Sequence, residues 1–269
     1  MSNVRSIPDI LLKIVETKKS EIKEIRREKP FFTRKIKDIH PALDFKNALS
    51  GEGLSVIAEI KKASPSAGII STHFRPLEIA LAYRKGGADA VSVLTDETYF
   101  KGSIGLITLV RNTLKNIPIL RKDFIIDDSQ IYEARAYGAD SFLLIAGILS
   151  LQQLEDFISL GRELGMEPLV EVHNETELFN AIQAKSDIIG VNNRNLRTFE
   201  LNTSLSKKLI SKIPACVTAV SESGIRSSKD TAYLHSLGFN AVLVGETLMR
   251  SGKDNCGKII TEFKKSIST

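Results

Sequence analysis

The chain has 269 residues, 42% of them hydrophobic, and its 37 Lys and Arg residues outnumber its 32 Asp and Glu residues, giving a formal net charge of +5. This length fits one large domain, such as a single α/β barrel, and leaves no room for a second catalytic domain. Because the basic residues are scattered among acidic ones, we expect a solvated surface that attracts small anions, and no nucleic-acid binding.

Cysteine usage and the lack of targeting signals indicate the compartment. Cys216 and Cys256 have neither CxxC spacing nor histidine neighbours, so we expect no disulfide framework and no metal site. The N-terminus lacks the apolar segment of a signal peptide, and no apolar run approaches the roughly 18 residues needed to cross a bilayer. We therefore expect a soluble cytoplasmic protein without membrane contact.

Residues 1–50 precede the first predicted strand and begin with a charged amphipathic segment. The apolar residues that would share one stripe of a helix are Ile10, Leu11, Ile14, Ile22 and Ile25. We favour a helical extension that packs on the rest of the chain over a partner-binding helix, because most apolar stripes face a core. Such a helix could also cover the mouth of a site.

Eight short apolar runs follow, and segments with helical spacing separate them. The predicted strands are 55–61, 90–95, 118–123, 140–145, 168–172, 188–193, 216–222 and 241–245. The predicted helices are 77–85, 104–114, 129–137, 151–164, 176–184, 204–210, 229–237 and 258–267. Eight successive β/α units are typical of a closed parallel barrel, so we predict an α/β fold with a single (β/α)8 TIM barrel over residues 1–269.

Polar and ionisable residues end several of these strands. In the first strand Glu59 and Lys61 lie two residues apart, and because side chains alternate along a strand they must share one face. Later strands end with 121–123, Glu171, 192–194 and 221–224. Charge at so many strand ends is costly unless it serves a site.

Three acids, Glu59, Glu171 and Glu222, and two lysines, Lys61 and Lys122, would meet at one end of such a barrel. A single buried Lys–Glu pair is more often a structural ion pair. A cluster of this size favours acid/base catalysis, because neighbouring charges tune pKa values. The histidines share no ligand pattern and are interpreted as surface or loop residues: His40, His73, His173 and His235.

The last two strands end in Gly224 and in Gly245 and Glu246, and Glu246 opens a short helical segment at 246–250. Loops after these strands, with a short helix that presents N–H groups, form the usual phosphate site of barrels. Either glycine alone fits a tight turn equally well, but both together favour phosphate. We expect the Glu246 side chain to point outward, because a carboxylate would repel the anion. The 62–68 loop could fold over the substrate, although alone it is an ordinary turn sequence.

Six strings at these strand ends follow a recognisable pattern, in order along the chain. They are IAEIKKASPS at 57–66, LRKDFI at 120–125, PLVEVH at 168–173, IGVNNRNL at 189–196, SESGI at 221–225 and VGETLM at 244–249. Together they resemble the indole-3-glycerol-phosphate synthase family, from about residue 5 to residue 265. The resemblance implies a lyase of tryptophan biosynthesis that closes the indole ring with loss of carbon dioxide and water. It implies neither a metal nor an organic cofactor.

The resemblance also implies roles for individual residues. The family residue that matches Lys122 is the general acid that protonates the substrate carbonyl. The residue that matches Lys61 holds the substrate carboxylate and is a second acid candidate. The residues that match Glu171 and Glu59 are acid/base carboxylates. The resemblance leaves the division of the last proton transfers open. Positions that match substrate-binding residues are Asn192, Arg194, Glu222, Ser223, Phe124 and Leu143. Positions that match the phosphate region are Ser64, Gly224, Gly245 and Glu246, where the family often has Gly-Ser in place of Gly-Glu.

Other functions remain open from the residues. A class I aldolase would use Lys122 to form a Schiff base. A phosphoribosylanthranilate isomerase shares the barrel and phosphate site but needs no pair of strand-end lysines. A non-catalytic sensor of phosphorylated ligands is disfavoured by the presence of Lys61, Lys122 and Glu171 together. We expect a small phosphorylated substrate as the partner and a monomeric protein.

Overall fold

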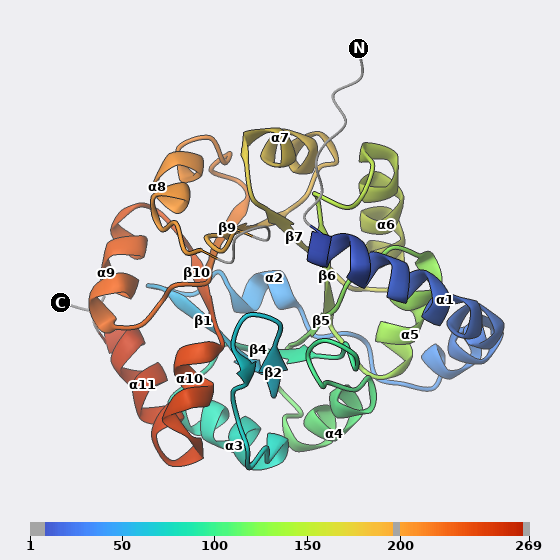
Figure 1. Cartoon of the computed structure of the whole chain (residues 1–269), viewed down its shortest axis with the longest axis horizontal. Helices are drawn as coiled ribbons and strands as arrows, with labels where there is room; N and C mark the ends of the chain where they lie inside the picture. The colour runs from blue at the N-terminus through green and yellow to red at the C-terminus, as the bar shows by residue number, and fades with distance from the viewer. Residues whose placement is uncertain (1–8, 196–199, 266–269) are drawn as a thin grey trace.

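Eight parallel strands form a closed barrel in the computed structural model, which describes residues 9–195 and 200–265 (Figure 1). In chain order they are β1 (Ser55–Ile60), β4 (Ala90–Leu94), β5 (Ile119–Lys122), β6 (Ser141–Ile145), β7 (Leu169–Val172), β8 (Ile188–Asn192), β9 (Thr218–Glu222) and β10 (Ala241–Val244). The barrel closes at β1, where Ile57 pairs with Leu243 of β10 and with Ala90 of β4. The predicted TIM barrel is confirmed, and strand bounds differ from the predicted ones by at most two residues.

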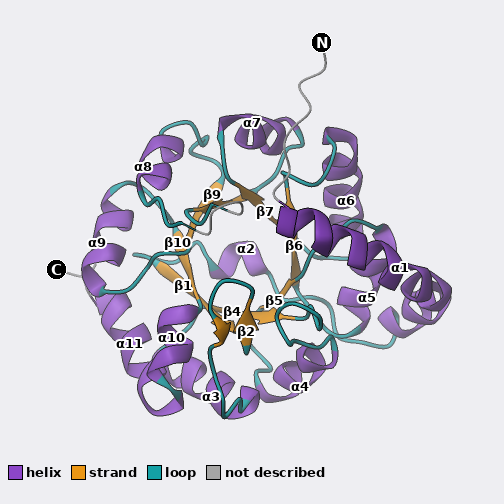
Figure 2. Cartoon of the chain, in the orientation of Figure 1, coloured by secondary structure: helices purple, strands orange, loops and turns teal. Residues whose placement is uncertain are grey.

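Helices alternate with the strands and form an outer ring (Figure 2). They are α3 (Pro76–Gly86), α4 (Gly105–Thr113), α5 (Asp128–Ala136), α6 (Leu151–Glu163), α7 (Glu175–Gln183), α8 (Ser204–Ile210), α9 (Ser228–Ser236), α10 (Glu246–Ser251) and α11 (Lys253–Lys265). Ser150 and Gln153 form a capping box that fixes the start of α6. The last helix begins earlier than predicted, and residues 266–267 of the predicted segment lie outside the described residues. None of the helices in the described part of the chain is long and apolar enough to span a bilayer.

Alternation along the strands divides the core into two layers. On β1, Val56 and Ala58 belong to the layer between barrel and helices, whereas Ile57 belongs to the layer inside the barrel. The short helix α2 (Phe45–Ala48), which comes just before β1, contributes Phe45 to the inner layer and lies across the barrel axis in Figure 1. The barrel interior is therefore filled at the amino ends of the strands, and a site remains available at their carboxyl ends.

The N-terminal segment forms one long helix, α1 (Asp9–Ile36), which packs beside α5 (Figure 1). Leu11, Ile14 and Ile22 of the predicted stripe are buried. Arg26 Nη2 lies 2.5 Å from Asp127 Oδ2, the residue that caps α5. Apolar burial and this cap contact together place α1 along the barrel wall, with its first turns at the barrel mouth.

A small antiparallel pair of strands, β2 (Ala63–Ser64) and β3 (Gly68–Ile69), follows β1. It lies within the segment expected only as a loop, because two-residue strands leave no periodic signal. Gly68 has φ +63°, a left-handed conformation that favours glycine. Ser64 Oγ accepts a hydrogen bond from the Ala67 N–H at 3.2 Å, which tightens this turn.

Candidate active site

A cavity of about 550 Å³ opens at the carboxyl ends of the strands, a size suited to a small organic ligand. Every residue that the sequence predicts for the site lines this cavity: Glu59, Lys61, Ser64, Lys122, Phe124, Leu143, Glu171, Asn192, Arg194, Glu222, Ser223, Gly224, Gly245 and Glu246. The barrel thus gathers residues from most of its strand ends into one space. Leu196, the last residue of the 189–196 string, lies outside the described residues.

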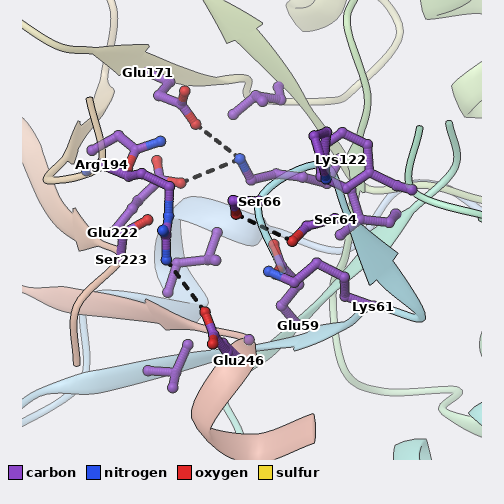
Figure 3. A pocket seen from close by; sticks show the side chains of 18 of the residues that line it. Glu59, Lys61, Ser64, Ser66, Lys122, Glu171, Arg194, Glu222, Ser223 and Glu246 are labelled. Carbon is purple, nitrogen blue, oxygen red and sulfur yellow. Dashed lines mark hydrogen bonds and ion pairs between the residues drawn. The ribbon is translucent and has the colours of Figure 1, made fainter. Parts of the chain in front are cut away.

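Lys122, at the end of β5, is the centre of the buried charges (Figure 3). Its Nζ lies 2.8 Å from Glu171 Oε2 on β7 and 3.4 Å from Glu222 Oε2 on β9. Both carboxylate side chains are 2% exposed. One cation therefore faces two carboxylates in a poorly solvated space, which is the arrangement that separates the pKa values of neighbouring groups.

The pKa values of the three groups diverge. Burial favours a neutral amine at Lys122, but the attraction of Glu171 and Glu222 outweighs it and raises the lysine pKa. Burial opposes the charge of Glu171 as well, yet Lys122 and His173 hold its pKa well below the ordinary range. Burial, offset only in part by Lys122 and reinforced by Glu171, raises the pKa of Glu222 to about 8. At neutral pH the site holds an ammonium, a carboxylate and a protonated carboxyl group.

Glu59 and Lys61 form a second ion pair, at the end of β1. Their contact confirms that the two side chains share one face of the strand. Gly245, at the end of β10, leaves the space that this pair occupies: an added Cβ would overlap the Glu59 carboxylate and lie 3.0 Å from Lys61 Nζ. Glycine at 245 is thus required by the ion pair itself, a reason that the sequence pattern did not indicate.

The phosphate end predicted for the cavity combines strained backbone with polar side chains. Ser223 has φ +67° and Gly224 has φ +82°, so both residues adopt the left-handed conformation at the end of β9. For Ser223 this conformation is sterically costly, and such strain is concentrated at functional sites. The residues that follow this turn contact α10, where Thr247 Oγ1 donates a hydrogen bond to the Ile225 carbonyl at 2.6 Å.

The expectation that the Glu246 side chain points outward is wrong. Its Oε2 lies 3.3 Å from Arg194 Nη2 (Figure 3). Its Oε1 accepts a hydrogen bond from Arg250 Nε at 3.0 Å. Burial disfavours its charge, but Arg250 and Arg194 hold the pKa of Glu246 below the ordinary value. The two guanidinium groups keep this carboxylate ionised at the cavity wall. Repulsion by a bound phosphate alone would have turned it outward.

One wall of the cavity is apolar. Phe124 and Leu143 are nearly or fully buried, and the Phe100 and Phe124 ring centroids lie 5.9 Å apart. Leu11 and Ile14 of α1 complete this wall. The N-terminal helix thus supplies part of the pocket surface, the further role that its sequence left open.

His173 is the functional candidate that the sequence reasoning missed, because it was assigned to the surface or to a loop. Its Nε2 lies 3.2 Å from Glu171 Oε1, and its Nδ1 lies 3.1 Å from Glu177 Oε2. The available signal was its spacing: His173 follows Glu171 by two residues, just as Lys61 follows Glu59.

A second charge network lies behind the end of β5. Lys18 of α1, 3% exposed, has its Nζ 2.9 Å from Asp96 Oδ2 and 3.1 Å from Asp123 Oδ1. Arg121 Nη2 lies 3.3 Å from Asp123 Oδ2, and its Nη1 lies 2.8 Å from Glu133 Oε2. Within the described ranges, no group of three or more His, Cys, Asp and Glu side chains is arranged to hold a metal ion.

Known proteins share both the sequence and the fold. A family model described as "Indole-3-glycerol phosphate synthase" matches residues 11–262. A protein of Endomicrobium trichonymphae with the same name is 47% identical over 259 residues, which cover 95% of this chain and 99% of that protein. A namesake from Chloroherpeton thalassium is 48% identical over 245 residues, covering 89% of this chain and 94% of that protein.

A solved structure of thiamine phosphate pyrophosphorylase from Pyrococcus furiosus superposes with a TM-score of 0.60 at 15% identity, covering 84% of this chain and 98% of that one. This likeness supports the barrel fold alone. The family model and the relatives go further, because they span nearly the whole chain, including every strand end that lines the cavity. The chain belongs to the indole-3-glycerol phosphate synthase family.

Proposed function

We propose that Lys122, Glu171, Lys61 and Glu59 carry the proton transfers of the family's reaction in this chain. As a member of the family, the chain is a carbon–carbon lyase of tryptophan biosynthesis (EC 4.1.1.48). It converts 1-(2-carboxyphenylamino)-1-deoxy-D-ribulose 5-phosphate into indole-3-glycerol phosphate by ring closure, decarboxylation and dehydration. The observation that carries the assignment of roles is the Lys122 ammonium, held between two buried carboxyl groups in the cavity.

Lys122 is the general acid of ring closure. When the aromatic carbon attacks the ribulose carbonyl, a carbon–carbon bond forms and the carbonyl oxygen becomes an alkoxide that takes a proton from the ammonium. A preorganised cation in a water-poor site stabilises such a charge by several kcal/mol, about 2.7–4 for one donor. Glu222, which holds a proton at neutral pH and lies 3.4 Å from Nζ, is placed to return it.

Lys61, Glu59 and Glu171 serve the later steps. Lys61 holds the substrate carboxylate until carbon dioxide leaves and the bonding electrons restore the aromatic ring. Loss of the new hydroxyl as water then needs an acid, for which Lys61 is suited, and formation of the pyrrole double bond needs a base. Glu171, ionised at neutral pH, is suited to be that base, with Glu59 as the partner that keeps Lys61 charged.

The remaining residues bind the substrate. Phe124 and Leu143 form the apolar wall for its aromatic ring, while Asn192, Arg194 and Ser223 orient its hydroxyls and its carboxylate. Glu222 supports the ring-closure position. The residues assigned to the phosphate are Ser64, Gly224, Gly245 and Glu246, with backbone N–H groups as the main donors. The Glu246 carboxylate keeps Arg194 in place, so it acts on the substrate through that arginine.

We also propose that residues 1–269 form a single barrel domain, with residues 1–50 an extension that packs on it, and that the protein is a cytoplasmic monomer. The apolar contacts of Leu11 and Ile14 with the barrel interior support one domain. A sedimentation experiment tests whether the protein is a monomer.

The function is tested by incubating the protein with the carboxyphenylamino-deoxyribulose phosphate and following indole fluorescence. Borohydride added with substrate tests the aldolase alternative, because an imine would leave a covalent adduct on Lys122. We expect indole fluorescence and no adduct, since the raised pKa of Lys122 keeps the amine protonated and poorly nucleophilic.

A further inference from the structure

A buried row of three side chains runs from the cavity to the start of α7. Glu171 Oε1 lies 3.2 Å from His173 Nε2, and the other ring nitrogen lies 3.1 Å from Glu177 Oε2. The second oxygen of Glu171 lies 2.8 Å from Lys122 Nζ. Each oxygen of the Glu171 carboxylate therefore lies within ion-pair distance of its own nitrogen, Lys122 Nζ or His173 Nε2, and rotation of the carboxylate would lengthen one of these contacts.

Glu177 is itself held rigidly. Its Oε2 accepts a hydrogen bond from the His173 backbone N–H at 2.8 Å, and its Oε1 accepts one from Asn174 Nδ2 at 2.6 Å. Asn174 caps α7 by accepting the Glu177 N–H at 2.9 Å. The orientation of the imidazole ring is thus determined by the cap of a helix, which is a rigid element of the barrel.

The imidazole ring carries a positive charge at neutral pH. Burial acts against that charge, but hydrogen bonding and attraction by Glu171 and Glu177 raise the pKa of His173 to about 10. These two carboxylates are the charged groups that act on the ring, and Lys122 faces the opposite oxygen of Glu171. With a pKa raised above its ordinary value, His173 remains an imidazolium below about pH 10 and loses the charge above it.

We propose that His173 is a positioning residue, which fixes the Glu171 carboxylate and keeps the shared proton of the buried acids on Glu222. This inference rests on the proposed role of Glu171 as a base. Two carboxyl groups on one lysine compete for a proton, and a second cation beside one of them decides which stays ionised. Without His173, Glu171 would hold the proton for a larger fraction of the time and could not accept another.

Two variants separate the two contacts of the ring. His173→Gln can place an amide N–H near the position of Nε2, toward Glu171, whereas His173→Asn reaches only the position of Nδ1, toward Glu177. His40→Asn is the matched control, because His40 is an exposed histidine between α1 and α2. For each variant, kcat and KM are measured between pH 6 and 10 together with the melting temperature.

We expect His173→Asn to lower kcat by up to about 10²-fold with little change in KM, the loss attributed to a misplaced catalytic group. His173→Gln should retain more activity than His173→Asn. Both variants should shift the apparent pKa of the carboxyl pair upward by about one unit or more, because both remove the positive charge. His40→Asn should match the wild type in every measurement.

Unmoved pH profiles in both His173 variants would overturn the proposal, even if activity and melting temperature fell, because a purely structural contact lowers both without shifting the pKa of the carboxyl pair. Glu171→Gln distinguishes this failure from failure of the proposed function. If Glu171→Gln is inactive and the His173 variants behave as wild type, Glu171 keeps its role and the positioning by His173 is rejected. If Glu171→Gln retains full turnover, the role of Glu171 itself is rejected.

Discussion

Two buried charge networks meet at the end of β5, at the neighbouring residues Lys122 and Asp123. Lys122 faces the cavity with Glu171 and Glu222, and the next residue, Asp123, is engaged by Lys18 of the N-terminal helix. Both networks are built from Lys and carboxylate side chains with ion-pair distances of about 3 Å. The residue types and distances alone would therefore not distinguish the two networks.

They differ in how the pKa of a buried acid responds to its neighbours. In the Lys18 network, Arg121 and Lys18 overcome the effect of burial and hold the pKa of Asp123 below its ordinary value. In the Lys122 network, one lysine serves two buried acids, and the pKa of Glu222 rises to about 8. Two cations keep Asp123 ionised in the first network, whereas the second network retains a proton that it can transfer. A carboxyl group with a raised pKa beside a cavity is thus a sign of chemistry.

Lys122→Ala should give the largest effect of any single change. The variant removes both a general acid, worth about 10²–10⁴ in rate, and the cation at the developing alkoxide, so we expect turnover to fall by about 10⁴-fold or more. Affinity for the substrate should change far less, because phosphate and carboxylate are bound elsewhere. Single-turnover fluorescence measures the loss, and turnover above a few per cent of wild type would contradict the assignment.

Glu171→Gln should give the second-largest loss of turnover. The substitution keeps the shape and removes the ionisation, so kcat should fall by about 10²–10⁴-fold while KM changes little. Steady-state kinetics with the same substrate measures both constants and checks this prediction. An unchanged kcat would make Glu171 a structural charge, like those of the Lys18 network.

Lys18→Met should lower stability, whereas Lys122→Ala and Glu171→Gln lower the rate of turnover. Removing one partner of a buried ion pair costs about 3–5 kcal/mol, because Asp96 and Asp123 are left without their cation. The control is Lys19→Met: the neighbouring side chain is 60% exposed and pairs with Glu16, so little change in unfolding free energy is expected. Urea unfolding of both variants measures the difference, and equal effects would contradict a structural role for Lys18.

The same pair of lysines marks the limit of prediction from sequence. Periodicity predicted the strands, and the two-residue rule predicted that Glu59 and Lys61 share a face, because both signals are local. Helical spacing places Lys18, four residues from both Ile14 and Ile22, on the buried stripe. No local pattern indicates its partners Asp96 and Asp123, which come from loops far along the chain. Contacts between distant segments depend on the closed barrel and not on any local pattern.

Two features of the site had sequence signals of their own. His173 lies in the loop after β7, as expected, and the two-residue spacing that brings Glu59 and Lys61 together also brings His173 to Glu171. Glu246 was treated only as a charge near phosphate. The partner four residues along its helix, Arg250, could have been expected from helical spacing, whereas Arg194 could not.

Gly245→Val and Glu246→Gln sharpen the comparison at the phosphate end. A side chain at 245 would collide with the Glu59–Lys61 pair, so we expect a loss of kcat in addition to a KM raised by about tenfold or more. Glu246→Gln keeps the backbone donor and releases Arg194, so KM should rise only a few-fold. Equal damage from both variants would show that the carboxylate itself contacts the substrate.

Glu222→Gln should slow turnover less than Lys122→Ala does, and its effect on stability should depend on pH. The pKa of Glu222 in the folded chain is raised to about 8, so the folded state holds a proton that the unfolded state releases near pH 4.5. This contribution is fully present below pH 4.5 and is lost as pH rises through about 8, so above that pH the wild type contains a poorly matched carboxylate. A neutral glutamine avoids this loss. We expect a melting temperature about 2–4 °C or more above that of wild type at pH 9, and a smaller difference at pH 5. A pH-independent difference would mean that the pKa of Glu222 is not raised, and the contrast with Asp123 would then disappear.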